Sequence, residues 1–390
     1  MRGYLSLRSS TAENREILSR ILDRAVKTFP NIRSVALLPS SYYSELFSGV
    51  LETLSQSTQL QELSVNRSSL NDAYLAYLRK IVGLKALTIR DPLSAFTKLL
   101  SEGWLGRMSG SLVELHLEGI CCAIPSHVLY AELANLKRIR TLSIGYLGAQ
   151  SESSLFSALA SLPDLRFLSL QYDEEIPENC YRLSLISLTI RYFGPQSQSD
   201  SSGLCSWVQA IMSSCPLEEL HLIDDNGEAI NGDMGRDENF HRFVQYIVLH
   251  HASTLRLLRM PNIFFGADTL ECIYAKCNSL EELTFATSRN ALLSVYPSHP
   301  NMRSLCALSV SLRDVDGNGD LRLSLADAGV IMGRIPSLRS LIANNSEWKV
   351  NRVSLDYLLN SYTPLSEFLG HIERFSLPSK DRRTNRNLIE

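Results

Sequence analysis

The stretch "SCPLEELHL", from Ser214 to Leu222, contains the pattern that decides the fold. Leu217, Leu220 and Leu222 occupy positions one, four and six of a hexad. Side chains alternate between the two faces of an extended chain, so positions four and six point to the same side of a short strand. One such strand cannot bury its leucines alone. The hexad therefore predicts a strand that must stack against others of the same kind.

The hexad recurs thirteen times along the 390 residues, with other apolar residues replacing some leucines. The copies are about 28 residues apart on average, which is the length of a leucine-rich repeat. Their fourth positions, each inside an expected strand, are Val35, Leu63, Leu87, Leu115, Leu142, Leu168, Leu188, Leu220, Leu258, Leu283, Leu308, Leu341 and Phe375. The regular succession indicates one sheet that is built from consecutive repeats.

Segments between the hexads have the apolar spacing of amphipathic helices. In "FHRFVQYIVLHHA", Phe240, Phe243, Val244 and Ile247 recur three or four residues apart. Such a helix returns the chain to the same edge for the next parallel strand. The predicted fold class is an α/β leucine-rich-repeat solenoid. It is a curved horseshoe with a parallel sheet on the concave face and helices on the convex face.

The repeat array sets the expected domain organisation. Residues 1–378 are predicted to form a single solenoid that starts in mid-repeat, because Leu5-Ser6-Leu7 has the form of half a hexad without a polar cap before it. This start indicates a truncated member of a longer family, or an end that a partner covers. Residues 193–203 and 224–238 are expected to be long loops, and the basic tail 379–390 is expected to fray.

Bulk composition excludes several classes of protein. A net charge of −3 argues against nucleic acid or an anionic membrane as the main partner, and 18 apolar residues nowhere run together. The eight cysteines form no disulfide framework, so they are expected to be reduced and mostly buried. The expected location is the cytoplasm or the nucleus.

The segment "DVDGNGDLRLSL" (314–325) has the beginning of a calcium loop. Asp314, Asp316, Asn318 and Gly319 meet four requirements of such a loop, but Leu325 stands where a bidentate Glu is needed. A repeat strand, not a helix, leads into the segment. We interpret it as a polar turn and leave weak calcium binding by Asp314–Asp320 as an alternative.

No catalytic motif is present, and no catalytic residue, metal or cofactor is predicted. His116 and His221 both occupy position five of a hexad. They are four repeats apart, which is about 19 Å at the spacing of neighbouring strands and too far for one metal ion. We therefore interpret both as solvated surface residues.

Solenoids usually bind their partners on the concave face. Eight of the twelve residues at position five are Ser or Thr, and the columns beside them have charges of both signs. This composition fits recognition of another protein and equally fits an idle solvated sheet. The candidate binding residues are Glu62, Arg90, Glu114, His116, Glu118, Phe167, Arg191, Glu219, His221, Arg259, Glu282 and Arg374.

Phrases such as "SSCPLEELHL" and "AKCNSLEELTF" make the chain resemble the leucine-rich regions of fungal F-box proteins. The resemblance implies a non-enzymatic substrate-recognition solenoid of a ubiquitin ligase, in which an F-box binds a Skp-type adaptor. No F-box is recognisable here, since Leu38-Pro39-Ser40 falls in a repeat strand and its exit. A Skp-type adaptor is therefore an expected partner only if the F-box is supplied elsewhere.

A second resemblance is to leucine-rich activators of the Ran GTPase. It implies GTPase activation through an arginine on a loop. No arginine of this chain stands in a signature that singles it out. The protein-binding scaffold is the favoured prediction, and a GTP-hydrolysis assay separates the two.

Overall fold

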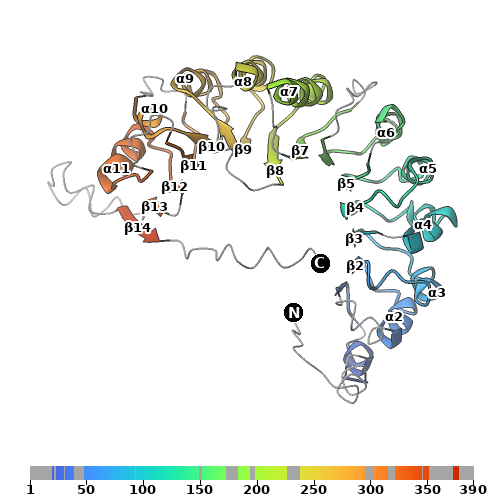
Figure 1. The fold of residues 1–390 in the computed structure, drawn as a ribbon. Helices are drawn as coiled ribbons and strands as arrows, with labels where there is room; N and C mark the ends of the chain where they lie inside the picture. The colour runs from blue at the N-terminus through green and yellow to red at the C-terminus, as the bar shows by residue number, and fades with distance from the viewer. Residues whose placement is uncertain are drawn as a thin grey trace. The chain divides into compact units, whose positions relative to one another are not determined.

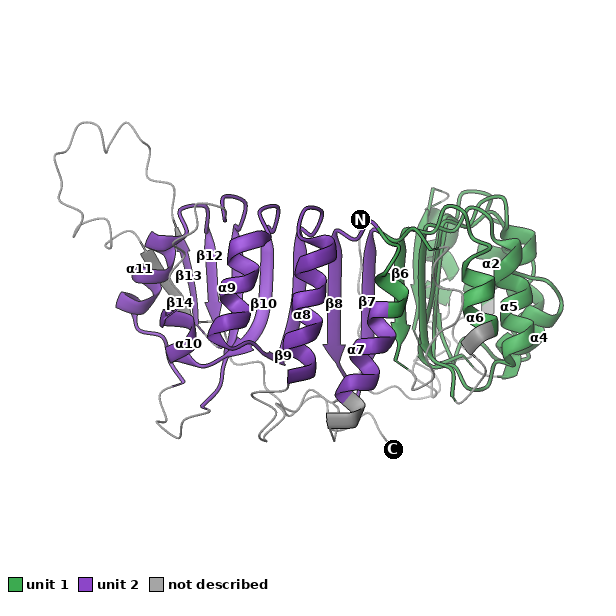
Figure 2. Cartoon of the chain, turned by 90° about the horizontal axis from the view of Figure 1, so that it is seen from above, with its two compact units in different colours: residues 1–185, 210–215 green, residues 186–209, 216–390 purple. Residues whose placement is uncertain are grey.

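The structure is a computed structural model (Figure 1). It describes residues 20–21, 23–29, 31–38, 48–92, 94–148, 152–172, 183–193, 198–225, 238–294, 302–314, 321–344, 346–350 and 372–376. The chain divides into two compact units (Figure 2). Unit 1 comprises residues 1–185 and 210–215, and unit 2 comprises residues 186–209 and 216–390. The single domain over residues 1–378 stays a prediction.

Unit 1 is an array of parallel strands in the order of the chain, with helices between them. The register aligns the hexads, so that Leu63, Leu87 and Leu115 are direct neighbours. The strands are β1 (Ser34–Leu37), β2 (Glu62–Asn66), β3 (Ala86–Arg90), β4 (Glu114–Ile120), β5 (Thr141–Tyr146) and β6 (Phe167–Gln171). The helices are α2 (Ser48–Ser55), α3 (Leu75–Leu78), α4 (Ser94–Ser101), η2 (Gly106–Met108), α5 (Ser126–Asn135) and α6 (Glu152–Leu159).

Unit 2 repeats this plan from β7 to β12 and then changes it. The parallel strands are β7 (Ser187–Tyr192), β8 (Glu219–Asp224), β9 (Leu257–Phe264), β10 (Glu282–Thr287), β11 (Ala307–Leu312) and β12 (Ser340–Ala343). Two antiparallel strands follow, β13 (Ser346–Val350) and β14 (Ile372–Ser376). The helices are α7 (Gln198–Met212), α8 (Glu238–His251), α9 (Ala267–Lys276), α10 (Arg289–Ser294) and α11 (Leu325–Arg334).

Leucines of the hexads form the core of each unit. In β8, Leu220 and Leu222 are almost completely buried, and Leu115 and Leu117 are buried in the same way in β4. Burying one such side chain contributes about 1.5–3 kcal/mol. The helical pattern is confirmed too, since Phe240, Phe243, Val244 and Ile247 of α8 are all buried. The leucine-rich-repeat fold is therefore the fold of the chain.

A ladder of backbone hydrogen bonds joins neighbouring repeats at position two of the hexad. In unit 1, the carbonyl of Val113 accepts from the N–H groups of Arg140 at 2.8 Å and Thr141 at 3.1 Å. In unit 2, the carbonyl of Glu218 accepts from Arg256 at 2.7 Å and Leu257 at 3.0 Å. Each repeat therefore aligns the start of the next strand, and residues at position two become neighbours.

The thirteenth hexad does not form the parallel strand that the sequence predicted. Its strand β14 pairs antiparallel with β13, and β13 pairs antiparallel with β12. Ala343, the last residue of β12, is the register partner of Ser346, the first residue of β13, so the loop between the two strands is short. Asn344, which follows β12, has the positive φ (49°) that Asn tolerates. A strand that returns directly through such a loop runs antiparallel, so the parallel repeat ends at β12.

The predicted loops are partly wrong. Helix α7 begins at Gln198, inside the segment 193–203, and its Ser201 is fully buried. The Asn239 Nδ2 group donates to the Ser201 hydroxyl at 3.1 Å, which provides a partner for a polar residue at this position. Asp224 ends strand β8, and residues 226–237 of the second predicted loop lie outside the described residues. The mid-repeat start at Leu5 and the tail 379–390 also lie outside them.

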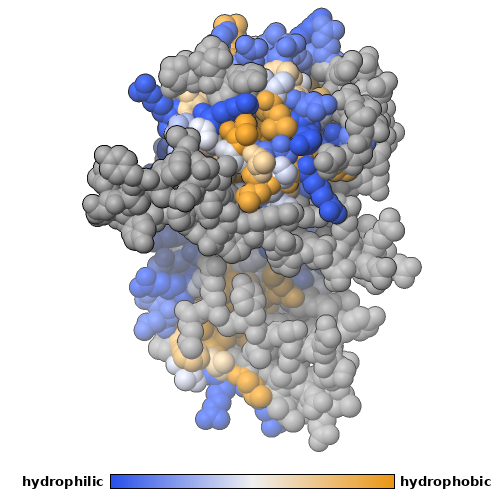
Figure 3. Space-filling model, turned by 90° about the vertical axis from the view of Figure 1, so that its left-hand side faces the viewer, coloured by the Kyte–Doolittle hydropathy of each residue, from blue (hydrophilic) through white to orange (hydrophobic). Residues whose placement is uncertain are grey.

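Helix α11 is buried on one side, through Ala328, Ile331 and Met332. Its other side exposes Leu325 and Val330. Figure 3 views the molecule from the side of α11 and shows apolar surface among hydrophilic residues. No helix among the described residues is long and apolar enough to cross a membrane.

Candidate functional site

In each unit, the strands have an open face on the side opposite the buried leucines. We define this open face by hexad positions three, five and seven. Position five of unit 1 forms one continuous column, because the register aligns it from strand to strand. The column consists of the exposed Ala36 and the half-buried Ser64, Thr88, His116, Ser143 and Ser169. In unit 2 the corresponding column consists of Thr189, His221, Arg259, Thr284, Ser309 and Ile342.

The charged residues of the open face in unit 1 form pairs on β3 and β4. Arg90 and Glu118 are register partners, and the Arg90 Nε lies 3.0 Å from the Glu118 carboxylate. The His116 Nε2 lies 4.0 Å from the Glu114 carboxylate on the same strand. Glu62 is exposed on β2. Phe167, at the start of β6, exposes 40% of its surface. The face therefore combines the ion pair Arg90–Glu118 with an accessible aromatic ring.

The open face of unit 2 has a second cluster on β8, β9 and β10. Arg259 contacts the Glu282 carboxylate at 2.6 Å, and the register places His221 beside Arg259. Burial and the Arg259 charge lower the pKa of His221, against the opposing effect of Glu219 and Glu282. His221 is thus neutral at pH 7 and offers one donor and one acceptor. Arg191, at the end of β7, contacts Asp225 at 2.9 Å.

Eleven of the twelve candidate residues lie where the hexad register predicts them, and Arg374 does not. Residue 374 is the register partner of Trp348, and Trp348 is the partner of the buried Leu341. The antiparallel pairing therefore aligns residue 374 with the column of position four rather than with an open-face column. Binding by the other eleven residues stays a prediction.

Metal and thiol chemistry have little support in the described part of the chain. It contains no group of three or more His, Cys, Asp or Glu side chains that could hold a metal ion. Only Asp314 of the calcium-like segment 314–320 is described. Burial raises the pKa of Cys121 to about 12, and that of Cys277 likewise to about 12, so these thiols are poor nucleophiles. Cys122 is exposed, whereas the cysteines were expected to be mostly buried.

An exposed apolar pair on unit 1 was missed at the level of sequence. The pairing of β4 with β5 shifts between Leu117 and Ile120, and Ile120 becomes the partner of Tyr146. Ile120 exposes 65% of its surface and Tyr146 exposes 42%. Gly119, with φ 79°, permits this bulge. A glycine inside a strand was the available signal.

Comparison with known proteins supports no family assignment. No protein-family profile matches the chain, and no curated protein matches it. A chain of the crystal structure of the yeast Rad7 and Elc1 complex is similar at 14% identity and a TM-score of 0.48, over 84% of this chain and 81% of that chain. A chain of the TLR13–ssRNA13 complex is similar at 14% identity and a TM-score of 0.34, over 82% of this chain and 41% of that chain.

Proposed function

We propose that the chain is a protein-binding scaffold whose open sheet faces receive another protein. The observation that supports this proposal most directly is the make-up of these faces. Short polar side chains form the central column of each face. The face of unit 1 also has the ion pair Arg90–Glu118 and the exposed Phe167, and the face of unit 2 has the ion pair Arg259–Glu282. Protein interfaces combine polar pairs with aromatic anchors in this way.

Charge distribution on the floor favours a protein over a regular polyanion. On the open face of unit 2, Glu219 on β8 and Glu282 on β10 are both register partners of Leu257 on β9. The cation Arg259, two residues further along β9, contacts Glu282. On unit 1, Glu62, Glu114 and Glu118 outnumber Arg90. A phosphate backbone requires a stripe of cations. We propose no nucleic-acid role for the open faces.

A test of this proposal compares affinity capture by three forms of the full chain from the cell that expresses it. The open-face variant is H221A/R259A. The matched control is E271A/R242A, which removes one acid and one base from exposed positions on helices α9 and α8. The proposal expects at least one protein that the wild type and the control recover and that the open-face variant loses. If all three forms recover the same proteins in equal amounts, the proposal is wrong.

The finer part of the proposal is that the scaffold selects substrates for an F-box-type ubiquitin ligase. Its only support is the resemblance of segments such as "SSCPLEELHL" and "AKCNSLEELTF" to the leucine-rich regions of fungal F-box proteins. The same capture tests it separately, because the wild type should also recover a Skp-type adaptor. An open-face partner without that adaptor would refute the ligase role and leave the scaffold in place.

A further inference from the structure

The edge of unit 1 at which helices lead into strands has a concentration of cations. We call it the basic edge and define it as the described residues 29, 31–33, 56–61, 79–85, 102–113, 136–140 and 160–166, which precede strands β1 to β6 and include the short helix η2. It contains nine cations and only two anions, Glu102 and Asp164. The cations are Arg33, Arg79, Lys80, Lys85, Arg107, Lys137, Arg138, Arg140 and Arg166. The whole chain has a net charge of −3, so this edge differs sharply from the average.

Most of these cations have no carboxylate partner among the described residues. Arg79 takes one of the two anions of this edge, since it contacts Glu102 at 2.5 Å. Glu132 of α5 lies beneath the edge, but it is buried and accepts the N–H of Gly106 at 2.9 Å. Asp164 remains as the one further carboxylate. Among the described residues of unit 1, this edge therefore has a clear excess of positive charge.

Backbone carbonyls account for some of these cations. The Arg138 Nη1 donates to the Gly110 carbonyl at 2.6 Å, and the Lys137 Nζ donates to Ser161 at 3.2 Å. Carbonyls near helix C-termini attract cations, so these residues have a structural role. No such contact is found for the side chains of Lys85 and Arg140 among the described residues, and both are exposed. These two cations are available to an external anion.

The ladder at position two brings these cations together. The Lys85 carbonyl accepts from Val113 N–H, and the Val113 carbonyl accepts from Arg140 N–H, which links the three neighbouring repeats. Arg140 and Arg166 belong to adjacent repeats, about 5 Å apart at the spacing of parallel strands. The next residue after each of them, Thr141 or Phe167, is the position-three residue of the open face. The basic edge is thus continuous with the proposed binding face.

Unit 2 lacks this concentration at the same edge. Its described residues between helices and strands include three cations, Arg256, Arg303 and Arg339, and two anions, Glu218 and Glu281. Arg256 contacts both anions, at 2.6 Å and 3.7 Å. Unit 2 therefore provides an internal comparison, in which the same repeat architecture is nearly balanced in charge.

From these observations we propose that the basic edge binds an acidic segment of a polypeptide that also carries apolar residues. The exposed side chain of Val82 lies between Lys80 and Lys85 in sequence and suits an aliphatic contact. Single-stranded nucleic acid requires successive aromatic platforms, and Phe29 is the one exposed aromatic residue of the described edge. Arginine forks bind carboxylates with two parallel hydrogen bonds. This inference rests on the proposed function in one respect, that the partner is a protein.

The test uses a fluorescein-labelled 12-residue peptide of alternating Glu and Leu, and the same peptide with Gln in place of Glu. The full chain should bind the Glu peptide at least about tenfold more tightly, with a Kd that rises as salt is added. Arg140→Gln should weaken binding about threefold or more, and K85Q/R140Q about tenfold or more. The matched control is Arg339→Gln, which should leave the Kd unchanged. Arg339 is exposed in unit 2, at position two of the hexad that contains β12.

Two further measurements define the partner class. Val82→Ser should weaken binding of the Glu–Leu peptide, and a 12-nucleotide single-stranded DNA should bind less tightly than the peptide. Equal effects of Arg140→Gln and Arg339→Gln would overturn the proposal, and so would tighter binding of the DNA. The capture with H221A/R259A is independent of these results. If H221A/R259A loses a partner in that capture, while substitution of Lys85 and Arg140 leaves the Kd of the Glu–Leu peptide unchanged, this inference is wrong and the proposed function stands.

Discussion

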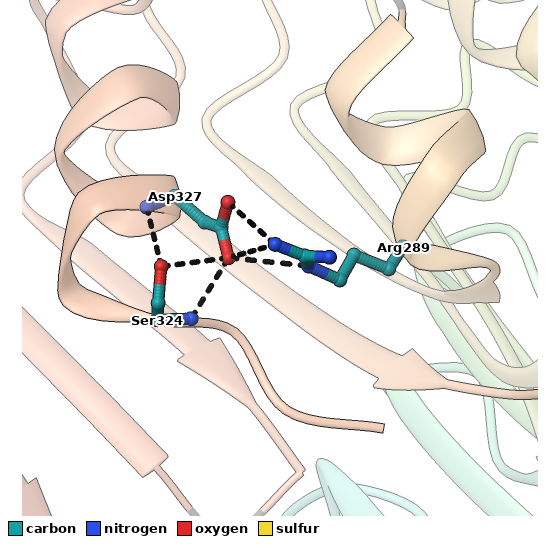
Figure 4. A network of polar contacts seen from close by, with 3 residues as sticks. All are labelled: Arg289, Ser324 and Asp327. Atoms are coloured by element: carbon teal, nitrogen blue, oxygen red, sulfur yellow. Dashed lines mark hydrogen bonds and ion pairs between the residues drawn. The ribbon is translucent and has the colours of Figure 1, made fainter. Parts of the chain in front are cut away.

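Arg289, the first residue of α10, binds Asp327, the third residue of α11, through two guanidinium nitrogens. The Nη2 atom lies 2.8 Å and the Nε atom 3.2 Å from the Asp327 Oδ2 (Figure 4). The same oxygen accepts the Ser324 N–H at 2.9 Å, and the Ser324 hydroxyl accepts the Asp327 N–H at 3.1 Å. This capping box and the arginine together attach the start of α11 to the start of α10.

Asp327→Asn should lower the free energy of unfolding by about 2 kcal/mol at pH 7, because it removes charged hydrogen bonds at a helix N-terminus. Burial raises the pKa of Asp327, but hydrogen bonds from Ser324 and Arg289 outweigh burial and lower it overall. The contribution is therefore present above the ordinary Asp pKa of about 3.9 and is lost as the pH falls through the lower folded value.

Urea unfolding across the acid range measures this effect. The curves of the wild type and D327N should converge at low pH. Asp268→Asn, in the first turn of α9, is the matched control, and it should lower the free energy of unfolding at pH 7 by less than D327N does. A difference between the wild type and D327N that does not change with pH would contradict the prediction.

Gly145→Ala should destabilise unit 1 by about 2 kcal/mol or more, because an added Cβ would overlap the backbone carbonyl of Gly119 in the neighbouring strand. Gly110→Ala is the control, since nothing lies within 4 Å of a Cβ at that position. Thermal unfolding of both variants measures the difference. Equal melting temperatures for the two variants would show that the bulge at Gly119 accommodates the added methyl group without loss of stability.

His251→Gln should flatten the pH dependence of stability between about pH 7 and pH 5. His251 is buried at the end of α8, and burial together with the charge of His250 lowers its pKa. The unfolded chain therefore takes up a proton at higher pH than the folded chain does. Stability contributed by the neutral imidazole is full above the ordinary His pKa of about 6.5 and is lost as the pH falls through the lower folded value.

Guanidinium unfolding at several pH values compares H251Q with H127Q, whose substituted histidine is exposed on α5. H251Q should show the shallower slope of stability against pH. Identical slopes in both variants would mean that His251 is protonated as readily in the folded chain as in the unfolded one.

Trp348→Ala should destabilise unit 2 by about 3–5 kcal/mol, because Trp348 is fully buried on β13 opposite Leu341. Lys349→Ala, at the neighbouring exposed position, should cost less than about 0.5 kcal/mol. Chemical denaturation measures both variants. A small effect of Trp348→Ala would argue against the antiparallel end of the sheet.

Substitutions of Arg259 and Glu282 should leave stability almost unchanged. The pair lies at 2.6 Å, but the two side chains expose 46% and 39% of their surface, and exposed pairs couple by less than about 1 kcal/mol. A double-mutant cycle of Arg259→Ala and Glu282→Ala, followed by urea unfolding, measures the coupling. A coupling well above that value would assign the pair to the fold rather than to the open face.

Strands β1 to β12 and their outward columns were predictable because alternation along a strand is local. Once Leu220 and Leu222 are buried, His221 must point the other way. The turn at Asn344 and the bulge at Gly119 involve residue types that favour turns and bulges, but the hexad pattern does not contain them. Each changes the pairing between two segments, and periodicity within one segment does not report that pairing.

The sequence by itself determined which residues of the hexads in β1 to β12 are buried, since the spacing of leucines and the alternation of side chains depend only on the chain around each hexad. Tertiary structure decided which distant residues became neighbours. Hydrogen bonds between repeats, formed only when strands stack in register, align Lys85, Arg140 and Arg166 on one edge. The antiparallel return of β13 aligned residue 374 with Leu341 instead of an open-face column. The register between strands is a property of the folded sheet, so it places these charges where the local pattern cannot.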